Sequence, residues 1–246
     1  MQLLIDIGNT SLKWALWDGE SLSATASARH GGAVPIDVLA AWDQIEDVDA
    51  VRIATVASAN LNHTVASVCQ ARWGKRPEPI TAAMLAERSP VRIAYQDSQR
   101  LGIDRWLGML AAHDQHVGPK LVVDAGSAIT YDILLGDGRH LGGLILPGVT
   151  LMRDSLLAGT EIPSHELAVG ADLDWATDTG GAIASACIQA PAALTERIWD
   201  RLRARAGGED PTLILTGGDA ERLLPAIVRP VTHRAELVLE GLALYS

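Results

Sequence analysis

The hydrophobic pattern opens with a short apolar strand at residues 3–7 that is interrupted by one acid, Asp6. A polar Gly-Asn-Thr turn follows, and then a second apolar stretch that ends at Asp18-Gly19, a dipeptide typical of tight hairpin turns. A third strand is expected over residues 21–27. The first part of the chain therefore predicts three consecutive strands joined by tight turns.

The same order returns in the second half of the chain. An apolar strand at residues 121–125 carries Asp124 and is followed by Gly126, and the next apolar stretch closes at Asp137-Gly138. A third strand, expected over 140–146, again follows. Two unrelated hairpins are the simple alternative. Because strand, acid, glycine and downstream turn agree in order, we favour a duplicated unit.

Between these strand groups, apolar residues recur at helical intervals, as Leu101, Trp106, Met109 and Leu110 do. Helices are expected over 34–43, 61–73, 101–113, 180–206 and 234–244 and from Asp219, with further strands over 51–57 and 213–215. Strands mixed with helices predict an α/β fold. The polar stretch 114–120 contains a Gly-Pro breaker and suits a linker. The expected domains are residues 1–115 and 116–246.

Composition narrows the class of protein. The 246 residues are 48% hydrophobic and 20% charged, which is a globular balance, and the formal net charge of -10 disfavours nucleic acid as a partner. Cys69 and Cys187 are the only cysteines, so a reducing compartment fits better than a disulfide framework. No signal peptide is recognised at the start and no apolar run reaches the ~20 residues that span a bilayer. We expect a cytoplasmic protein without a membrane partner.

The first candidate site is the turn after residues 3–7. Gly8 allows a ligand to approach the backbone, Asn9, Thr10 and Ser11 offer neutral donors, and Lys13 adds a cation. This set suits the phosphates of a nucleotide, with Asp6 holding magnesium or its waters. An ordinary turn is the alternative, since Gly-Asn-Thr is good turn chemistry in any protein.

The second candidate repeats the first, with Asp124, Gly126, Ser127 and Thr130 in corresponding positions. Two such turns facing each other could hold one nucleotide. Their two acids would otherwise repel, so a bound cation would explain why they come together. Alternatively, Asp124 only organises its own turn.

Three further segments carry weaker signals. Asp104 at an expected helix start could take a proton from a substrate hydroxyl, and Arg105 could pair with a substrate carboxylate. An acid favoured by the helix dipole beside a solvated arginine is an equally good account. Thr216-Gly217-Gly218 suits contact with a nucleotide but also occurs for local reasons. The glycines of 142–148 are best read, on their own, as turn markers.

Taken together, these motifs resemble the type III pantothenate kinases of the acetate-and-sugar-kinase/Hsp70/actin superfamily. The resemblance runs along most of the chain, with the motifs in the order of the family. They are Asp6-Ile-Gly-Asn-Thr10, Gly102-Ile-Asp-Arg105, Asp124-Ala-Gly-Ser-Ala-Ile-Thr130, Gly142-Gly-Leu-Ile-Leu-Pro-Gly148, Thr179-Gly-Gly181 and Leu239-Glu-Gly-Leu242. The family pattern commonly has threonine where this chain has Ser127, which keeps the hydroxyl.

The resemblance implies a duplicated ribonuclease-H-like, actin-like fold of two similar lobes with a cleft between them, and a homodimer. It implies phosphorylation of the primary hydroxyl of pantothenate by ATP, the first step towards coenzyme A, with Mg²⁺ and a monovalent cation, K⁺ or NH₄⁺. Asp104 matches the general base and Asp124 the monovalent-cation ligand. The ATP-binding positions are Asp6, Ile7, Gly8, Asn9, Thr10, Ser11, Leu12, Lys13 and Ser127. The pantothenate-binding positions are Tyr95, Gly102, Ile103, Asp104, Arg105 and Thr179, the last expected to come from the partner subunit.

Three rival functions remain open at this point. An ATP-binding accessory protein resembling the Bvg accessory factor group shares these motifs, although the intact Asp104-Arg105 pair favours an enzyme. A ribonuclease-H-like nuclease would use clustered acids for two metals, but the chain shows no basic stripe. A kinase of the same fold that acts on another small hydroxyl compound would share the phosphate-binding residues.

Overall fold

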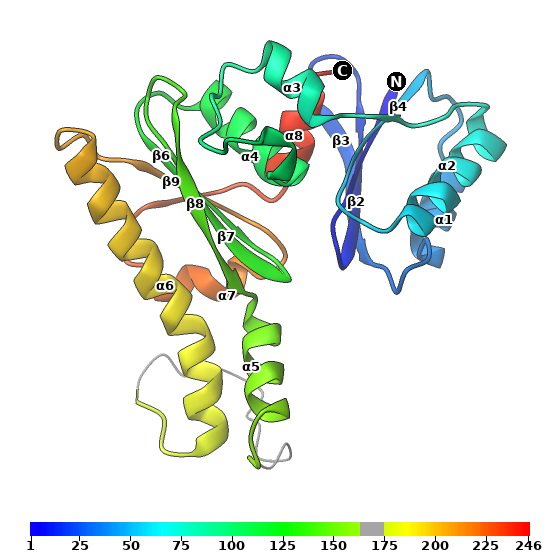
Figure 1. Ribbon diagram of the computed structural model, residues 1–246. Coiled ribbons are helices and arrows are strands. Elements are labelled where there is room, and N and C mark those ends of the chain that lie inside the picture. Colours follow the sequence, from blue (N-terminus) through cyan, green and yellow to red (C-terminus); the bar gives the residue numbers. More distant parts are fainter. Residues whose placement is uncertain (163–174) are drawn as a thin grey trace. The chain divides into compact units, whose positions relative to one another are not determined.

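The computed structural model describes residues 1–162 and 175–246 (Figure 1). The chain divides into two compact units, of which the first contains Met1–Gln115 and Glu236–Ser246 and the second contains His116–Ala235. Each unit is built around its own five-stranded sheet. Among the described residues, no helix is both long enough and apolar enough to cross a membrane.

In the first unit the sheet order is β3-β2-β1-β4-β5. Neighbours β1–β2 and β2–β3 are antiparallel, whereas β1–β4 and β4–β5 are parallel. The strands are β1 (Gln2–Ile7), β2 (Ser11–Trp17), β3 (Leu22–Arg29), β4 (Ala50–Thr55) and β5 (Glu78–Pro79). The helices are α1 (Ile36–Asp43), α2 (Ala59–Trp73), α3 (Ala82–Arg88), α4 (Ile103–Gln115) and α8 (Leu237–Ala243), with a 3₁₀ turn at Ser98–Arg100.

Alternation along β1 divides this unit into layers. Leu3, Ile5 and Ile7 are fully buried in one cluster with Trp42 of α1 and Leu61 of α2. Because successive strand residues point to opposite faces, the residues between them face the other side of the sheet. There α8 packs against β1, β2 and β4, and also against α4. This second layer matters for function because α4 begins at the predicted Gly102–Arg105 motif.

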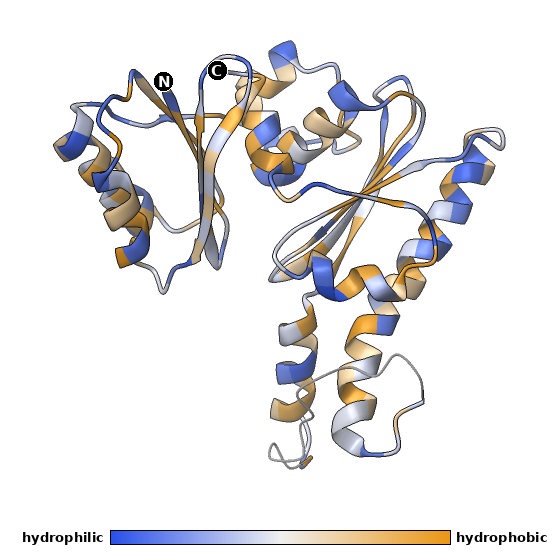
Figure 2. Ribbon diagram, turned by 180° about the vertical axis from the view of Figure 1, so that it is seen from behind, coloured by the Kyte–Doolittle hydropathy of each residue, from blue (hydrophilic) through white to orange (hydrophobic). Residues whose placement is uncertain are grey.

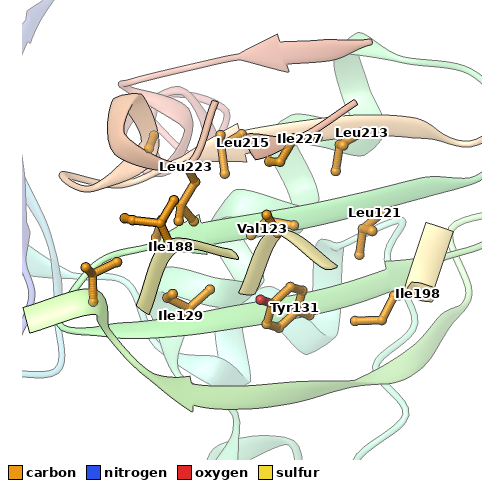
Figure 3. Close-up of a cluster of buried hydrophobic side chains, with 14 of the residues drawn as sticks. Leu121, Val123, Ile129, Tyr131, Ile188, Ile198, Leu213, Leu215, Leu223 and Ile227 are labelled. Atoms are coloured by element: carbon orange, nitrogen blue, oxygen red, sulfur yellow. The ribbon is translucent and has the colours of Figure 1, made fainter. Parts of the chain in front are cut away.

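The second unit repeats this plan with the sheet order β10-β9-β6-β7-β8. Its strands are β6 (Lys120–Ala125), β7 (Ala128–Leu134), β8 (His140–Pro147), β9 (Thr212–Thr216) and β10 (Val231–His233). Its helices are α5 (Val149–Ala158), α6 (Thr179–Arg205) and α7 (Ala220–Leu223), with a 3₁₀ turn at Leu224–Ala226. Figure 3 shows the core, where Val123, Tyr131 and Leu215 of the sheet meet Ile188 and Ile198 of α6.

The two sheets have the same topology. In each, an antiparallel three-strand meander lies on one side and two parallel strands follow on the other, so that β6 corresponds to β1 and β9 to β4. The predicted duplication of an α/β unit is confirmed. Asp6 and Asp124 occupy corresponding positions, each followed by a tight hairpin turn that begins with glycine two residues later, although the second turn is one residue shorter.

Some expected elements differ from the observed ones. Residues 236–246 were assigned to the second domain, but α8 packs against the first unit. The helix expected from Asp219 is a single short turn, α7, continued by the 3₁₀ turn. Gly142 and Gly143 do not mark a turn, because they lie within β8, where the register shifts opposite Ile133 and Leu134. This shift is a β-bulge, a position where glycine is common in strands.

Candidate functional site

The first predicted phosphate-binding segment is the hairpin tip between β1 and β2. Ile7 and Leu12 are buried on either side of it, and the amide of Gly8 donates to the carbonyl of Ser11 at 3.0 Å. Asn9 at the tip is exposed. The two apolar anchors fix the strand ends, so the polar residues between them are presented to solvent.

Asp6 and Lys13 are paired directly across these two strands. Directly opposed residues of antiparallel strands have neighbouring side chains on the same face. Only 8% of Asp6 is exposed, so its carboxylate is held close to the protein interior. The segment thus offers an acid, a cation and several backbone and hydroxyl donors within one turn.

Gly8 is not required by the packing of this chain. A Cβ built there would meet only the carbonyl oxygen of Ser11, at an ordinary distance of 3.6 Å. The corresponding Gly126 is similarly open, since its nearest contact would be the carbonyl oxygen of Ala128 at 3.6 Å. Both turns therefore leave room for a ligand to approach the backbone.

His30 is a residue of this site that the sequence did not reveal. Its Nε2 lies 3.0 Å from the carbonyl oxygen of Gly8, and its backbone amide donates to the carbonyl of Thr10 at 2.9 Å. The amide of Gly32 donates to His30 Nδ1 at 3.3 Å, so the neutral ring donates from Nε2. His30 therefore braces the tip from the side of β3. No motif marks His30 in the sequence; its place beside the tip follows from the β2–β3 register of the structure, which pairs Ser11 with Arg29.

The predicted acceptor-binding residues gather at the start of α4. Asp104 Oδ1 accepts a hydrogen bond from the amide of Arg105 at 2.8 Å. Arg105 in turn donates from Nη1 to the hydroxyl of Tyr95 at 3.2 Å, and its guanidinium lies 5.9 Å from the centre of that ring. A Cβ at Gly102 would collide with Asp104 Oδ1, so the glycine gives that carboxylate its place. Ile103 is buried and anchors the helix start.

In the second unit, the backbone of Gly148 supports the tip between β6 and β7. Its amide donates to the carbonyl of Ser127 at 2.9 Å. A Cβ at Gly148 would overlap the carbonyl oxygen of Gly126 and lie 2.7 Å from that of Ser127. Gly148 therefore permits a close approach of backbone to backbone that supports the predicted ATP contact Ser127, which is itself exposed.

Asp124 lies between two threonines. Across the sheet it is opposite Thr130 of β7 on one side and Thr216 of β9 on the other. Its Oδ1 also lies against Gly217, where an added Cβ would collide with it; that glycine has a φ of 96°. The structure thus places the Asp124–Thr130 motif beside Thr216-Gly217-Gly218, with one threonine paired with Asp124 on each neighbouring strand.

Thr179, the remaining predicted substrate residue, is the exposed first residue of α6. Its neighbour Asp178 caps the helix by accepting from the amide of Gly181 at 2.7 Å. Of the predicted site residues, those from Asp6 to Lys13 and from Tyr95 to Arg105 belong to the first unit. Asp124, Ser127 and Thr179 belong to the second.

Among residues 1–162 and 175–246, no group of three or more His, Cys, Asp or Glu side chains could hold a metal ion. A preformed all-protein magnesium cage is therefore not part of the described chain. Magnesium in phosphoryl-transfer sites is usually held by one or two carboxylates, water and the phosphates of the substrate. A single acid beside a predicted phosphate-binding turn, such as Asp6, fits this second arrangement.

Comparison with known proteins gives a consistent picture. Residues 2–201 match the family model for type III pantothenate kinase. A type III pantothenate kinase of Nitrosococcus oceani is 34% identical over 99% of this chain and 92% of its own length. One from Thiobacillus denitrificans is 36% identical over 98% and 94%.

Solved structures support the fold. A Baf family protein from Campylobacter jejuni superposes with a TM-score of 0.58 at 23% identity, covering 97% of this chain and 94% of its own. Component A of the (R)-2-hydroxyglutaryl-CoA dehydratase from Acidaminococcus fermentans gives a TM-score of 0.52 at 14% identity, with 100% and 96% coverage. At these identities the likeness concerns the fold, which is of the actin-like ATPase type.

Proposed function

Since the chain belongs to the type III pantothenate kinase family, we propose that it transfers the γ-phosphoryl group of ATP to the primary hydroxyl of pantothenate, the first step of coenzyme A synthesis. The family match along nearly the whole chain carries this proposal. Phosphoryl transfer depends mainly on positioning and on neutralising charge, with little covalent help from the protein. The residues described above are suited to both tasks.

The β1–β2 tip would hold the β- and γ-phosphates of ATP. The amides and hydroxyls of Asn9, Thr10 and Ser11 would donate to phosphate oxygens, Lys13 would offset their charge, and Asp6 would hold the magnesium ion or its waters. Magnesium bound there would neutralise part of the phosphate charge. The openness of Gly8 and Gly126 supports this role, because the protein's own packing does not demand glycine at either position.

At the start of α4, Asp104 would orient the pantothenate hydroxyl and accept its proton as the oxygen attacks the γ-phosphorus. Arg105 would pair with the pantothenate carboxylate. The contact between Arg105 and Tyr95 supports that role, since it holds the guanidinium in a defined direction. Gly102, Ile103 and Thr179 would complete the acceptor pocket.

Asp124 would bind a monovalent cation, K⁺ or NH₄⁺. Its flanking Thr130 and Thr216 supply hydroxyl oxygens, which suit such an ion better than a basic neighbour would. Replacing potassium by sodium in a steady-state assay should then suppress turnover. Equal rates in both salts would remove the cation from the proposal.

A homodimer is supported by exposed apolar residues of the second unit. Leu144 and Ile145 of β8, which is an edge strand, are 43% and 60% exposed, and Leu151 and Leu156 of α5 are 53% and 41% exposed. Figure 2 shows hydrophobic and hydrophilic bands along α5. Apolar groups of this kind commonly mark protein interfaces. Sedimentation or light scattering should give about twice the 26.1 kDa chain mass.

The decisive experiment replaces the general base. Asp104→Asn should lower kcat by about 10²–10⁴-fold, the usual contribution of general-base catalysis, while ATP binding persists. Asp37→Asn is a matched control, because Asp37 is also an acid in the first turn of a helix but is exposed on α1. If both variants keep full turnover, Asp104 is only an acid favoured by the helix dipole. ATP binding without pantothenate-dependent ADP release from the wild type would instead favour an accessory protein.

A further inference from the structure

The loop of residues 56–58 joins β4 to α2 and lies beside the predicted phosphate-binding tip. β4 is the parallel neighbour of β1, and its last residue, Thr55, pairs with Ile7, which directly precedes Gly8. One residue later, the amide of Val56 donates to the carbonyl of Ile7 at 3.0 Å. The backbone of this loop is therefore tied to the residue from which the tip starts.

Two successive carbonyl groups at the base of the tip are held from the two sides of β1. The carbonyl of Ile7 accepts from Val56 on the β4 side. The carbonyl of Gly8 accepts from His30, which directly follows β3. Because a peptide unit is planar, holding its carbonyl also fixes the direction of the N–H group that follows. These contacts therefore orient the amides of Gly8 and Asn9, and the second of these is proposed to meet phosphate.

Side chains set the shape of the loop. The hydroxyl of Thr55 donates to Asn62 Oδ1 at 2.8 Å and accepts from the amide of Ala57 at 3.1 Å. Asn62, which belongs to α2, also donates from Nδ2 to the carbonyl of Ala57 at 3.4 Å. All three residues are half-buried, so water competes only in part for these hydrogen bonds. This threonine–asparagine pair thus fastens the loop to the end of β4 and to the first turns of α2.

The second unit makes the corresponding link by other means. There the amide of Asp219, in the turn after β9, donates to the carbonyl of Ala125, the counterpart of Ile7, at 2.8 Å. That turn is shaped by Gly217, which has a φ of 96°. The loop after β4 contains no glycine, and the threonine–asparagine pair takes its place. The same link, made at both tips by different residues, supports a shared role in holding the tips.

We propose that Thr55 and Asn62 are positioning residues for the phosphates of ATP. Their hydrogen bonds keep the loop of residues 56–58 on Ile7, and so keep the tip in the conformation that binds phosphate. If this conformation is populated less, the apparent affinity for ATP falls by the same factor, whereas saturating ATP restores it. The pair therefore sets the KM for ATP and leaves kcat unchanged. The inference rests on the proposed function in placing ATP at this tip.

The test is the binding of a non-hydrolysable ATP analogue with magnesium to the full-length protein, measured by calorimetry. Thr55→Val keeps the shape of the side chain but removes its hydroxyl, and should weaken binding about three- to tenfold, as expected for one or two neutral hydrogen bonds. Asn62→Ala should have a similar effect. The double variant should bind little more weakly than either single variant, because both remove the same link. Thr55→Ser, which keeps the hydroxyl, should bind like the wild type.

Thr195→Val separates positioning from a general loss of stability. Thr195 is fully buried in the second unit, and its hydroxyl donates to the carbonyl of Pro191 at 2.8 Å. This control should lower the midpoint of urea unfolding, as Thr55→Val does, but leave the affinity for the analogue unchanged. In steady-state assays, Thr55→Val should raise the KM for ATP by the factor seen in binding, with kcat and the KM for pantothenate nearly unchanged.

Three results would overturn the proposal. The first is equal affinity for the analogue in the wild type, Thr55→Val and Asn62→Ala. The second is an equal loss of affinity in Thr195→Val, which would assign the effect to stability alone. The third is a lower kcat at saturating ATP with an unchanged KM. A wild type that binds the analogue without phosphorylating pantothenate would refute the proposed function alone, since the affinities would still decide the role of the pair.

Discussion

The contact between α4 and α8 allows a sharp test, because it contains two glycines with opposite surroundings. A Cβ at Gly241 of α8 would overlap the carbonyl oxygen of Leu107 and lie 2.7 Å and 3.0 Å from its carbonyl carbon and Cα. These are backbone atoms of α4 and cannot move alone. A Cβ at Gly108 of α4 would meet only Leu237 Cδ2, at an ordinary 3.7 Å. The two alanine variants therefore differ in sign.

In a helix interior, replacing glycine by alanine favours folding by about 0.5–1 kcal/mol. Gly108→Ala should gain roughly this amount, since nothing opposes it. Gly241→Ala must push α8 away from α4, and overpacking of this kind costs about 1–3 kcal/mol. Because the obstacle is backbone, we expect the upper end of that range. The net loss should then be about 2 kcal/mol.

Urea denaturation followed by tryptophan fluorescence measures both changes, since Trp14, Trp17, Trp42, Trp73 and Trp106 all belong to the first unit. The variants should shift the midpoint in opposite directions. If Gly241→Ala is as stable as Gly108→Ala, α8 does not pack closely on α4. Because α4 carries Asp104, the same loosening should also lower kcat in Gly241→Ala and leave Gly108→Ala active.

Three further predictions follow from particular contacts. Gly148→Ala should displace the Ser127 tip, which lowers the unfolding free energy and weakens ATP binding at least tenfold. Gly218→Ala, with nothing within 4 Å of the added Cβ, should leave the unfolding free energy nearly unchanged, and equal stability of the two variants would contradict the close approach at Gly148. His30→Ala should raise the KM for ATP about fivefold, the worth of one neutral hydrogen bond, and His30→Gln should restore part of it; no change in either would remove His30 from the site. Burial raises the pKa of the Cys69 thiol from 9.0 to about 12, so above pH 9 the unfolded chain releases this proton first, and Cys69 should lower stability by about 1.4 kcal/mol per pH unit; urea titrations across this range should show a slope smaller by that amount in Cys69→Ala.

The local parts of the fold could be predicted from the sequence because their causes are local. An apolar strand, an Asp-x-Gly turn and a second strand specify a hairpin, and two such sets revealed the duplication. The parallel neighbours β9 and β10 are different, since they join β6 from far along the chain. Likewise, nothing in the sequence of Leu237–Ala243 shows that this helix belongs to the first unit, because its partner Leu107 is distant.

The candidate site divides in the same way. The residues of each hairpin tip were evident from their motifs, whereas the residues that support the tips were not. Gly148 was interpreted as a turn marker, yet its need for glycine comes from the carbonyls of Gly126 and Ser127 across the fold. His30 carries no motif and gains its role only from the position of its ring beside Gly8. Tertiary contacts of this kind leave no periodicity in the sequence.

The two hairpins share a backbone plan but not a chemistry, and the difference is informative. Asp6 is flanked in the sheet by Lys13 and Ala54, whereas Asp124 is flanked by Thr130 and Thr216. A carboxylate beside a lysine already has a cation at hand, and the pair suits a site where phosphate charge is also present. A carboxylate between two hydroxyls offers only oxygen atoms, which is the ligand set of a hard cation. The duplicated hairpins thus differ at both strand positions that flank the acid, and under the proposed function these differences would direct Asp6 to magnesium-bound phosphate and Asp124 to a monovalent cation.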